Sequence, residues 1–162
     1  MDKQLSEENL LALELTEILW DFYLLKQPMA ESDSILENMM QLRFKDLLIS
    51  SLILRLCKLR DTDTRSLSFD QAIKSLRKQA ATAARVVGLE PQVKQYRKLT
   101  ENLEKHRDIR IAHLAKSGRG RLKPTLEIGD AVRLAVKIVD IISGIPVGYC
   151  AFGIDLRTEL GV

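Results

Sequence analysis

The stretch LLISSLILRLCKL, residues 47–59, decides the fold class of this chain. From Leu47 to Leu54 it is apolar on almost every side of a helix, which indicates a helix buried on more than one side. Such a helix lies either at the centre of the fold or at a contact between subunits. Two serines, Arg55 and Lys58 interrupt the apolar run, so it is too short and too polar to cross a bilayer.

This central helix is predicted to begin near Ser32 or Ser34 and to end near Leu59, because apolar residues recur at helical spacing over that range. Met39 and Met40 are interpreted as core filler rather than as the lining of a cofactor site. The residues predicted to face inward are Leu36, Met40, Phe44, Leu47, Ile53 and Leu56.

Helix-start and helix-stop signals place two helices on either side of the central one. Ser6, followed by two glutamates that favour the helix dipole, predicts a first helix that Pro28 ends. Ser68 and Gln71 have the spacing of a capping box, which predicts a third helix that starts at Phe69 and is closed by Gly88.

The remaining signals predict two more helices and a tail. Pro91 suits the first turn of a fourth helix that extends to about Leu114, and a fifth follows Pro124 and ends near Ser143. These five amphipathic helices predict an all-α antiparallel bundle in a single domain, residues 1–162. Its core covers about residues 5–145, and residues 146–162 form a short irregular tail.

Composition and charge restrict the function classes. The chain is 46% hydrophobic and 29% charged, as expected of a soluble globular protein. Residues 1–37 carry nine Asp and Glu against two Lys, whereas residues 78–124 carry twelve Lys and Arg against four Asp and Glu. This asymmetry predicts a basic face for a polyanion, or two opposite faces that meet when subunits associate.

Cysteine usage and the N-terminus favour a cytoplasmic protein without a membrane segment. Cys57 lies in an apolar helical run and is interpreted as a free, buried thiol. The acidic N-terminus does not have the pattern of a signal peptide.

The chemistry-bearing residues gather at the end of the fourth helix, in Arg107-Asp108-Ile109-Arg110-Ile111-Ala112-His113. At helical spacing, Arg110 shares a face with His113, and Arg107 lies about 120° away with a side chain long enough to swing toward it. Neutral imidazole can accept the proton of a 2′-hydroxyl, while Arg holds the phosphate, with no metal needed. Asp108 is placed to orient Arg107.

A basic loop follows this helix and is a candidate contact for an RNA backbone, with a solvated charge run as the alternative. Its cations are Lys116, Arg119, Arg121 and Lys123. His106 is interpreted as a residue at the edge of the cleft rather than as a ligand. The chain's two histidines, without a compatible Cys or carboxylate cluster, predict neither a metal site nor a cofactor.

The segment from Arg107 to His113 resembles the motif of the HEPN superfamily of all-helical domains: an Arg, a polar residue and, after a short spacing, a His. The run from residue 52 to residue 61, the polar loop after it and Arg110-Ile-Ala-His-Leu114 resemble the AbiU-like, abortive-infection branch. The resemblance covers residues 35–142 in outline.

The resemblance implies a homodimer in which the motifs of two subunits meet in one cleft. It also implies a metal-independent endoribonuclease that leaves 2′,3′-cyclic phosphate ends, acting as the toxin of a toxin–antitoxin or phage-defence system. Arg107 and His113 become the catalytic pair, and the auxiliary Asp108 fills the polar position of the motif. Arg110 has no counterpart in the motif and is an auxiliary only because it shares a helix face with His113. A nucleotidyltransferase is one possible antitoxin, although Ala115 stands where a related toxin group carries the Tyr that such a partner modifies.

Two other interpretations stay open at this point. Many HEPN domains keep the fold without activity, so the chain is alternatively an inactive HEPN-like module that binds RNA or a protein. The third interpretation is an unrelated helical bundle, because an Arg and a His with five residues between them occur readily by chance in a basic helix.

Overall fold

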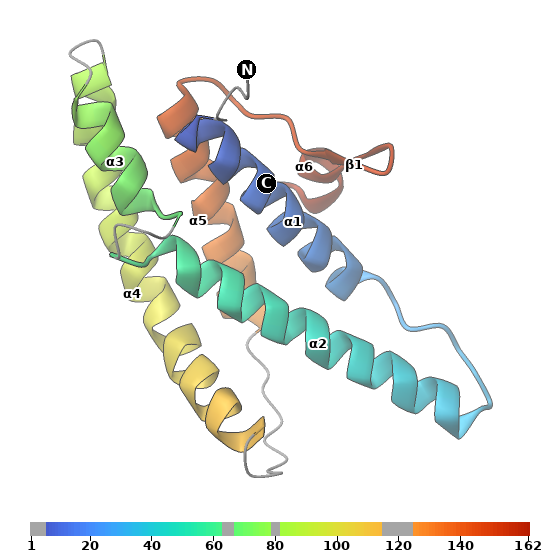
Figure 1. Ribbon diagram of the computed structural model, residues 1–162. Helices are drawn as coiled ribbons and strands as arrows, with labels where there is room; N and C mark the ends of the chain where they lie inside the picture. The colour runs from blue at the N-terminus through green and yellow to red at the C-terminus, as the bar shows by residue number, and fades with distance from the viewer. Residues whose placement is uncertain (1–5, 63–66, 79–81, 115–124) are drawn as a thin grey trace, which may run out of the picture.

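The computed structural model describes the backbone of residues 6–62, 67–78, 82–114 and 125–162. It describes the side chains of the same residues except those at positions 83, 109–114, 125 and 126. The described part is an all-α bundle with a very small sheet near the C-terminus, which confirms the predicted fold class (Figure 1).

The first two helices begin where the sequence predicted. Helix α1 (Glu7–Lys26) starts after Ser6, whose side chain accepts a hydrogen bond from the amide of Asn9. Helix α2 (Ile35–Leu59) starts after Ser34, which accepts from the amide of Glu37 in the same way. In both cases a serine oxygen satisfies an amide that the helix itself leaves without a partner.

The predicted boundary between the third and fourth helices is wrong. Helix α3 (Phe69–Arg77) already ends before Lys78, and α4 (Ala83–Leu114) runs through both Gly88 and Pro91. Pro91 lacks the amide that would bond to the carbonyl of Val87. Val87 is 75% exposed, so water can bond to that carbonyl, and the helix continues despite both signals.

The C-terminal part begins with α5 (Thr125–Ser143), which has the predicted bounds. The tail holds more structure than predicted: strands β1 (Cys150–Ala151) and β2 (Ile154–Asp155) pair antiparallel, and α6 (Leu156–Leu160) follows. Asp140 of α5 accepts hydrogen bonds from Arg157 at 2.6 Å and from the Val147 amide at 2.8 Å. These contacts tie the tail to the bundle.

The core lies around α5, which contacts α1, α2, α3 and α4. Its fully buried residues include Ile128, Val132, Ala135, Ile138, Val139 and Ile142. Helix α4 crosses α2 near the C-terminal end of α2. From this crossing, the N-terminal part of α2 and the C-terminal part of α4 extend in different directions (Figure 1). Within the described residues, no helix is long and apolar enough to span a membrane.

The predicted inward face of α2 is wrong for its N-terminal half. Ile53 and Leu56 are buried as predicted, but Leu36, Met40, Phe44 and Leu47 are exposed, and the interpretation of Met39 and Met40 as core filler is wrong for the single chain. The physical reason is orientation, because these residues lie on the side of α2 opposite to its buried residues, such as Leu52 and Leu56. Helix α2 also extends past the end of α1 (Figure 1).

Candidate active site on α4

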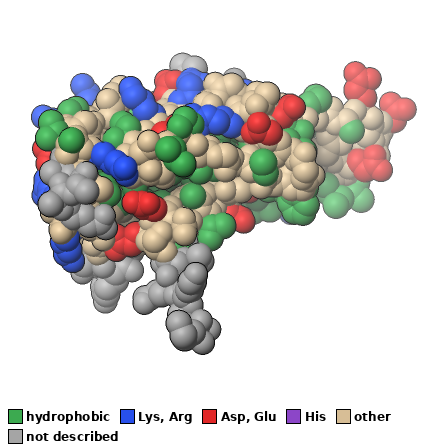
Figure 2. Space-filling view, turned by 90° about the horizontal axis from the view of Figure 1, so that it is seen from above, with side chains coloured by type: hydrophobic (Ala, Val, Ile, Leu, Met, Phe, Trp, Pro, Cys, Tyr) green, Lys and Arg blue, Asp and Glu red, His purple; other side chains and the backbone are tan. Residues whose placement is uncertain are grey.

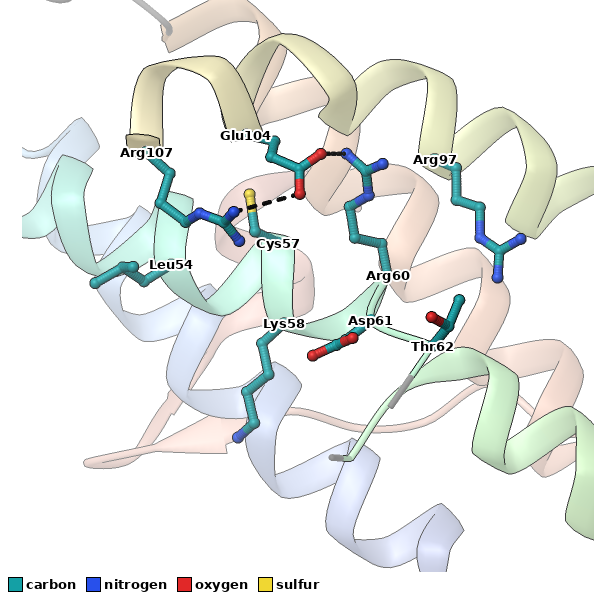
Figure 3. Close-up of a pocket in the computed structure, with 9 residues that line it drawn as sticks. All are labelled: Leu54, Cys57, Lys58, Arg60, Asp61, Thr62, Arg97, Glu104 and Arg107. Atoms are coloured by element: carbon teal, nitrogen blue, oxygen red, sulfur yellow. Dashed lines mark hydrogen bonds and ion pairs between the residues drawn. The ribbon is translucent and has the colours of Figure 1, made fainter. Parts of the chain in front are cut away.

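Arg107 lies on the side of α4 that faces the end of α2, beside an open pocket of about 630 Å³ (Figure 3). The pocket combines an apolar wall, Leu54 and the buried Cys57, with several charged side chains. The residues that line it are Leu54, Cys57, Lys58, Arg60, Asp61, Thr62, Arg97, Glu104 and Arg107. All of them come from α4, from α2 or from the segment directly after α2.

Glu104 joins two guanidiniums at this pocket (Figure 3). Arg107 Nη2 donates to Glu104 Oε1 at 3.3 Å, and Arg60 Nη1 lies 2.8 Å from Glu104 Oε2. Arg60 also donates to the Thr100 carbonyl at 3.3 Å. The side chains of Arg60 and Arg107 are 21% and 32% exposed, so both are held in place while solvent and solutes still reach them.

Asp108 fixes Arg107 from the other side. Arg107 Nε donates to Asp108 Oδ1 at 2.9 Å, and this hydrogen bond is the main cause that raises the pKa of Arg107. The guanidinium is therefore charged at every physiological pH. The contact expected between these two neighbours is present, and their role in a reaction stays a prediction.

Cys57 does not supply a nucleophile to the pocket. Its side chain is buried, and burial is the main cause that raises the pKa of the thiol to about 11. Because the thiolate is the reactive form, a thiol with this pKa is inert near neutral pH. The chemistry of the pocket thus rests on its charged groups.

His113 and Arg110 lie on the last turns of α4, and only their backbone is described. In a continuous helix, His113 is about 9 Å further along the axis than Arg107 and about 120° around it. His106, seven residues before His113, lies within about 20° of it around the axis. Arg107 and His113 therefore occupy different sides of one helix.

The side of α4 that carries His106 lies beside the first turn of α5. One turn before His106, Asn102 donates to Glu127 Oε1 of α5 at 3.4 Å. His106 is half-buried, and its Nδ1 has no hydrogen-bond partner among the described residues. The four cations of the predicted RNA-binding loop lie outside the described residues; they are Lys116, Arg119, Arg121 and Lys123.

Two members of this arrangement escaped sequence reasoning. Glu104 stands three residues before Arg107, a helical spacing that brings charged side chains together, and that signal was readable. Arg60 lies 47 positions away from Arg107 in the chain, and only the crossing of α2 and α4 reveals its part. Within the described residues, no three His, Cys, Asp or Glu side chains form a cluster that could hold a metal ion.

The chain was compared with protein families, curated proteins and solved structures. The model of the family HEPN_AbiU2, described as AbiU2, matches residues 2–149. The chain belongs to the AbiU2 family of HEPN domains. No curated protein and no solved structure gives a significant match.

The AbiU2 match extends from α1 through α5 and includes the whole segment from Arg107 to His113. It ends at Tyr149, directly before β1, so the hairpin and α6 lie outside it. The assignment connects this chain with HEPN proteins related to abortive infection, as the sequence resemblance predicted.

Proposed function

We propose that this AbiU2 protein is a metal-independent endoribonuclease that serves as the toxin of a toxin–antitoxin or phage-defence system. The observation that carries the proposal is the fixed Arg107 guanidinium, which stands at an open pocket six residues before a histidine on the same helix. Family membership supports the same chemistry.

In the proposed reaction, the neutral imidazole of His113 takes the proton of a ribose 2′-hydroxyl. The 2′-oxygen forms a bond to the adjacent phosphorus, and the bond from phosphorus to the 5′-oxygen breaks. The leaving 5′-oxygen takes a proton from water, and His113 returns the proton that it accepted to the solvent, so the products are a 2′,3′-cyclic phosphate and a 5′-hydroxyl. Arg107 neutralises the negative charge that develops on the phosphorane, and Arg110 adds a second cation nearby.

A second subunit belongs to this proposal. Arg107 and His113 lie about 120° apart around α4, so two copies of the motif facing one cleft bring more of these groups to a single phosphate than one copy does. An exposed apolar stripe along α2 provides a contact surface for the second copy. The stripe consists of Leu36, Met40, Phe44, Leu47 and Leu54, all exposed.

The position of the α2 stripe connects the association of two subunits with the pocket of Arg107. Its five members lie within about 80° of one another around the axis of α2, which is the geometry of a helix–helix seam. Leu54, at the end of the stripe, also lines the pocket of Arg107. A subunit that covers the stripe therefore reaches the edge of that pocket.

We also propose that residues 1–162 act as one domain, in the cytoplasm. Arg157 joins the C-terminal tail to α5 through Asp140, and α6 contacts α1, so the tail is packed on the bundle. Lys116, Arg119, Arg121 and Lys123 are proposed to contact the RNA backbone. An antitoxin, such as a nucleotidyltransferase, is the proposed controlling partner.

A second candidate function is a catalytically inactive module that binds RNA or a protein. The observation in its favour is that Arg107 is held by two carboxylates, Glu104 and Asp108, which compete with a phosphate for the guanidinium. In that case the pocket holds a ligand without breaking it.

The test is cleavage of RNA by the purified protein in EDTA, with analysis of the product ends. We expect 2′,3′-cyclic phosphate ends, and we expect His113→Ala to abolish cleavage while the circular dichroism spectrum stays unchanged. His106→Ala, seven residues earlier on the same helix, is the matched control and keeps activity. Cleavage that survives His113→Ala contradicts the proposal, and RNA binding without any cleavage favours the inactive module.

A further inference from the structure

A second pocket adjoins the pocket of Arg107 and continues it along α4. It lies between α3 and α4 and has a volume of about 460 Å³. Its lining residues are Asp70, Ile73, Lys74, Arg77, Glu90, Val93, Lys94 and Arg97. Arg97 lines both pockets, so the two pockets lie next to each other beside α4, and we call the pair the groove.

This groove has the length of a short nucleic-acid segment. From Arg107 to Lys94, α4 rises about 20 Å, and Arg97 stands about 15 Å from Arg107 along the axis. Successive phosphates of a helical strand are ~3.4 Å apart along its axis, so the groove can accompany several nucleotides. Figure 2 shows Lys and Arg side chains gathered on the half of the molecule opposite the projecting end of α2, where hydrophobic and acidic side chains gather.

The lining of the second pocket carries an excess of positive charge. Within the described part of the chain, Lys74 and Lys94 have no ion-pair partner. Arg97 pairs with Asp70, and Arg77 pairs with Glu90. The second pocket thus holds two cations more than its own carboxylates can neutralise, and these two are Lys74 of α3 and Lys94 of α4.

The lining also indicates which part of a nucleic acid fits. Among the described residues, no aromatic side chain lines either pocket, so this part of the groove has no platform on which a base can stack. Its floor is aliphatic, with Ile73 and Val93 buried. Cations without stacking groups suit the phosphates, which carry affinity but little sequence information.

We propose that the backbone of single-stranded RNA lies in this groove, with its phosphates at Lys74, Lys94 and Arg97 and its scissile linkage at Arg107. The position of the scissile linkage rests on the ribonuclease function proposed above, and the groove itself rests on the two adjoining pockets. This binding surface consists of described residues and does not include the basic loop after α4.

The test compares Lys74→Gln/Lys94→Gln with Lys137→Gln. Lys137 is an exposed lysine on α5 that lines neither pocket, so it is the matched control. The probe is a short, fluorescently labelled single-stranded RNA with 2′-O-methyl groups, which cannot be cleaved because it lacks the attacking hydroxyl. Fluorescence anisotropy measures Kd at several salt concentrations.

We expect the double variant to bind the probe several-fold more weakly at low salt. We also expect its salt slope, log K against log salt, to be smaller by about 1.4 in magnitude, since each single-strand phosphate contact contributes about 0.7. The control keeps the Kd and slope of the wild type. An unchanged Kd and slope in the double variant overturn the groove, as does equal competition by polyglutamate.

Because the probe is not cleaved, the outcome is independent of catalysis. If the wild type never cleaves RNA but the double variant loses affinity, the groove stands and the ribonuclease proposal falls. If the wild type cleaves RNA and the double variant binds like the wild type, the groove is wrong and the ribonuclease proposal stands. The unfolding midpoint of each variant is compared with that of the wild type, and an unchanged midpoint shows that the fold is intact.

Discussion

The Glu104 carboxylate lies 2.8 Å from the guanidinium of Arg60 and connects the end of α2 to α4. The same carboxylate accepts a hydrogen bond from Arg107. The position of Arg107 therefore depends on the crossing of two helices as well as on its own helix. The energies of its members are therefore expected to be coupled.

Arg60 and Glu104 are expected to be energetically coupled. A double-mutant cycle with Arg60→Ala, Glu104→Ala and the double variant should give a coupling energy of about 0.5–1 kcal/mol, because both side chains are partly exposed. Urea unfolding measures it. Asp130 and Arg133, a pair within the exposed surface of α5, provide the comparison, with a smaller expected value. A coupling energy near zero for Arg60 and Glu104 contradicts the connection.

Arg107→Lys should lower kcat/KM for RNA cleavage by about 10²-fold, as when one group that stabilises transition-state charge is lost. Lysine keeps the charge, but it lacks the planar fork that contacts Glu104 and Asp108 at once. Single-turnover kinetics on a defined RNA measure the loss. Arg133→Lys on α5 is the control and keeps the wild-type rate. Full activity in Arg107→Lys would show that the guanidinium geometry is unimportant.

Cys57 and Cys150 should differ in reactivity. Cys150 is exposed, whereas Cys57 is buried and its thiol has a pKa of about 11. Near neutral pH, iodoacetamide is expected to modify Cys150 and to spare Cys57 in the folded protein, as peptide mass spectrometry reads out. Denatured protein is the control, in which both cysteines react. Equal modification of both in the folded state contradicts the buried position.

The same pKa predicts the pH dependence of stability. Burial raises the pKa of Cys57 above its ordinary value of 9.0, so the fold favours the neutral thiol. The contribution of Cys57 to stability is thus complete below about pH 9 and is lost as pH rises toward 11. Cys57→Ala removes this dependence, and urea unfolding at several alkaline pH values compares it with the wild type. An identical decline in both proteins assigns the loss to other groups.

Leu47→Glu should separate subunits without unfolding them. Leu47 lies on the α2 stripe and is 68% exposed in the single chain, so the change is expected to alter the free energy of unfolding of that chain by no more than about 0.5 kcal/mol. A charge at the centre of an apolar contact weakens association, which sedimentation velocity detects as a monomer. Leu13→Glu, at an exposed position on α1, is the control and leaves the dimer intact. A dimer that persists in Leu47→Glu excludes the stripe as the contact.

Capping residues in the sequence were sufficient to predict where a helix starts, because side-chain hydrogen bonds to the first backbone amides decide that position. Ser6 and Ser34 marked the starts of α1 and α2 because their side chains satisfy amides that every helix leaves free. Gly88 and Pro91 misled for the opposite reason. A glycine inside a helix costs about 1 kcal/mol and a proline about 3 kcal/mol. The packing of α4 on its neighbours outweighs these costs.

Some residues of the candidate site could be found from the sequence, and others only from the packing of the helices. Arg107, Asp108 and His113 could be found from the sequence because they are close in one helix, and their spacing alone places them around its axis. Arg60, Arg97 and Lys74 could not, because they come to the same groove from different segments through the packing of α2 and α3 against α4.

The sequence by itself determined the all-α class, the starts of α1, α2 and α3 and the motif near the end of α4, since these depend on hydrogen bonds and spacing within a few turns. Only the tertiary structure decided which apolar faces are covered. The stripe from Leu36 to Leu54 has the same helical spacing as a core face, yet it is exposed because it lies on the side of α2 opposite to the one that α1, α4 and α5 cover. Burial is a property of neighbours, and a helical period cannot reveal whether a neighbour is there.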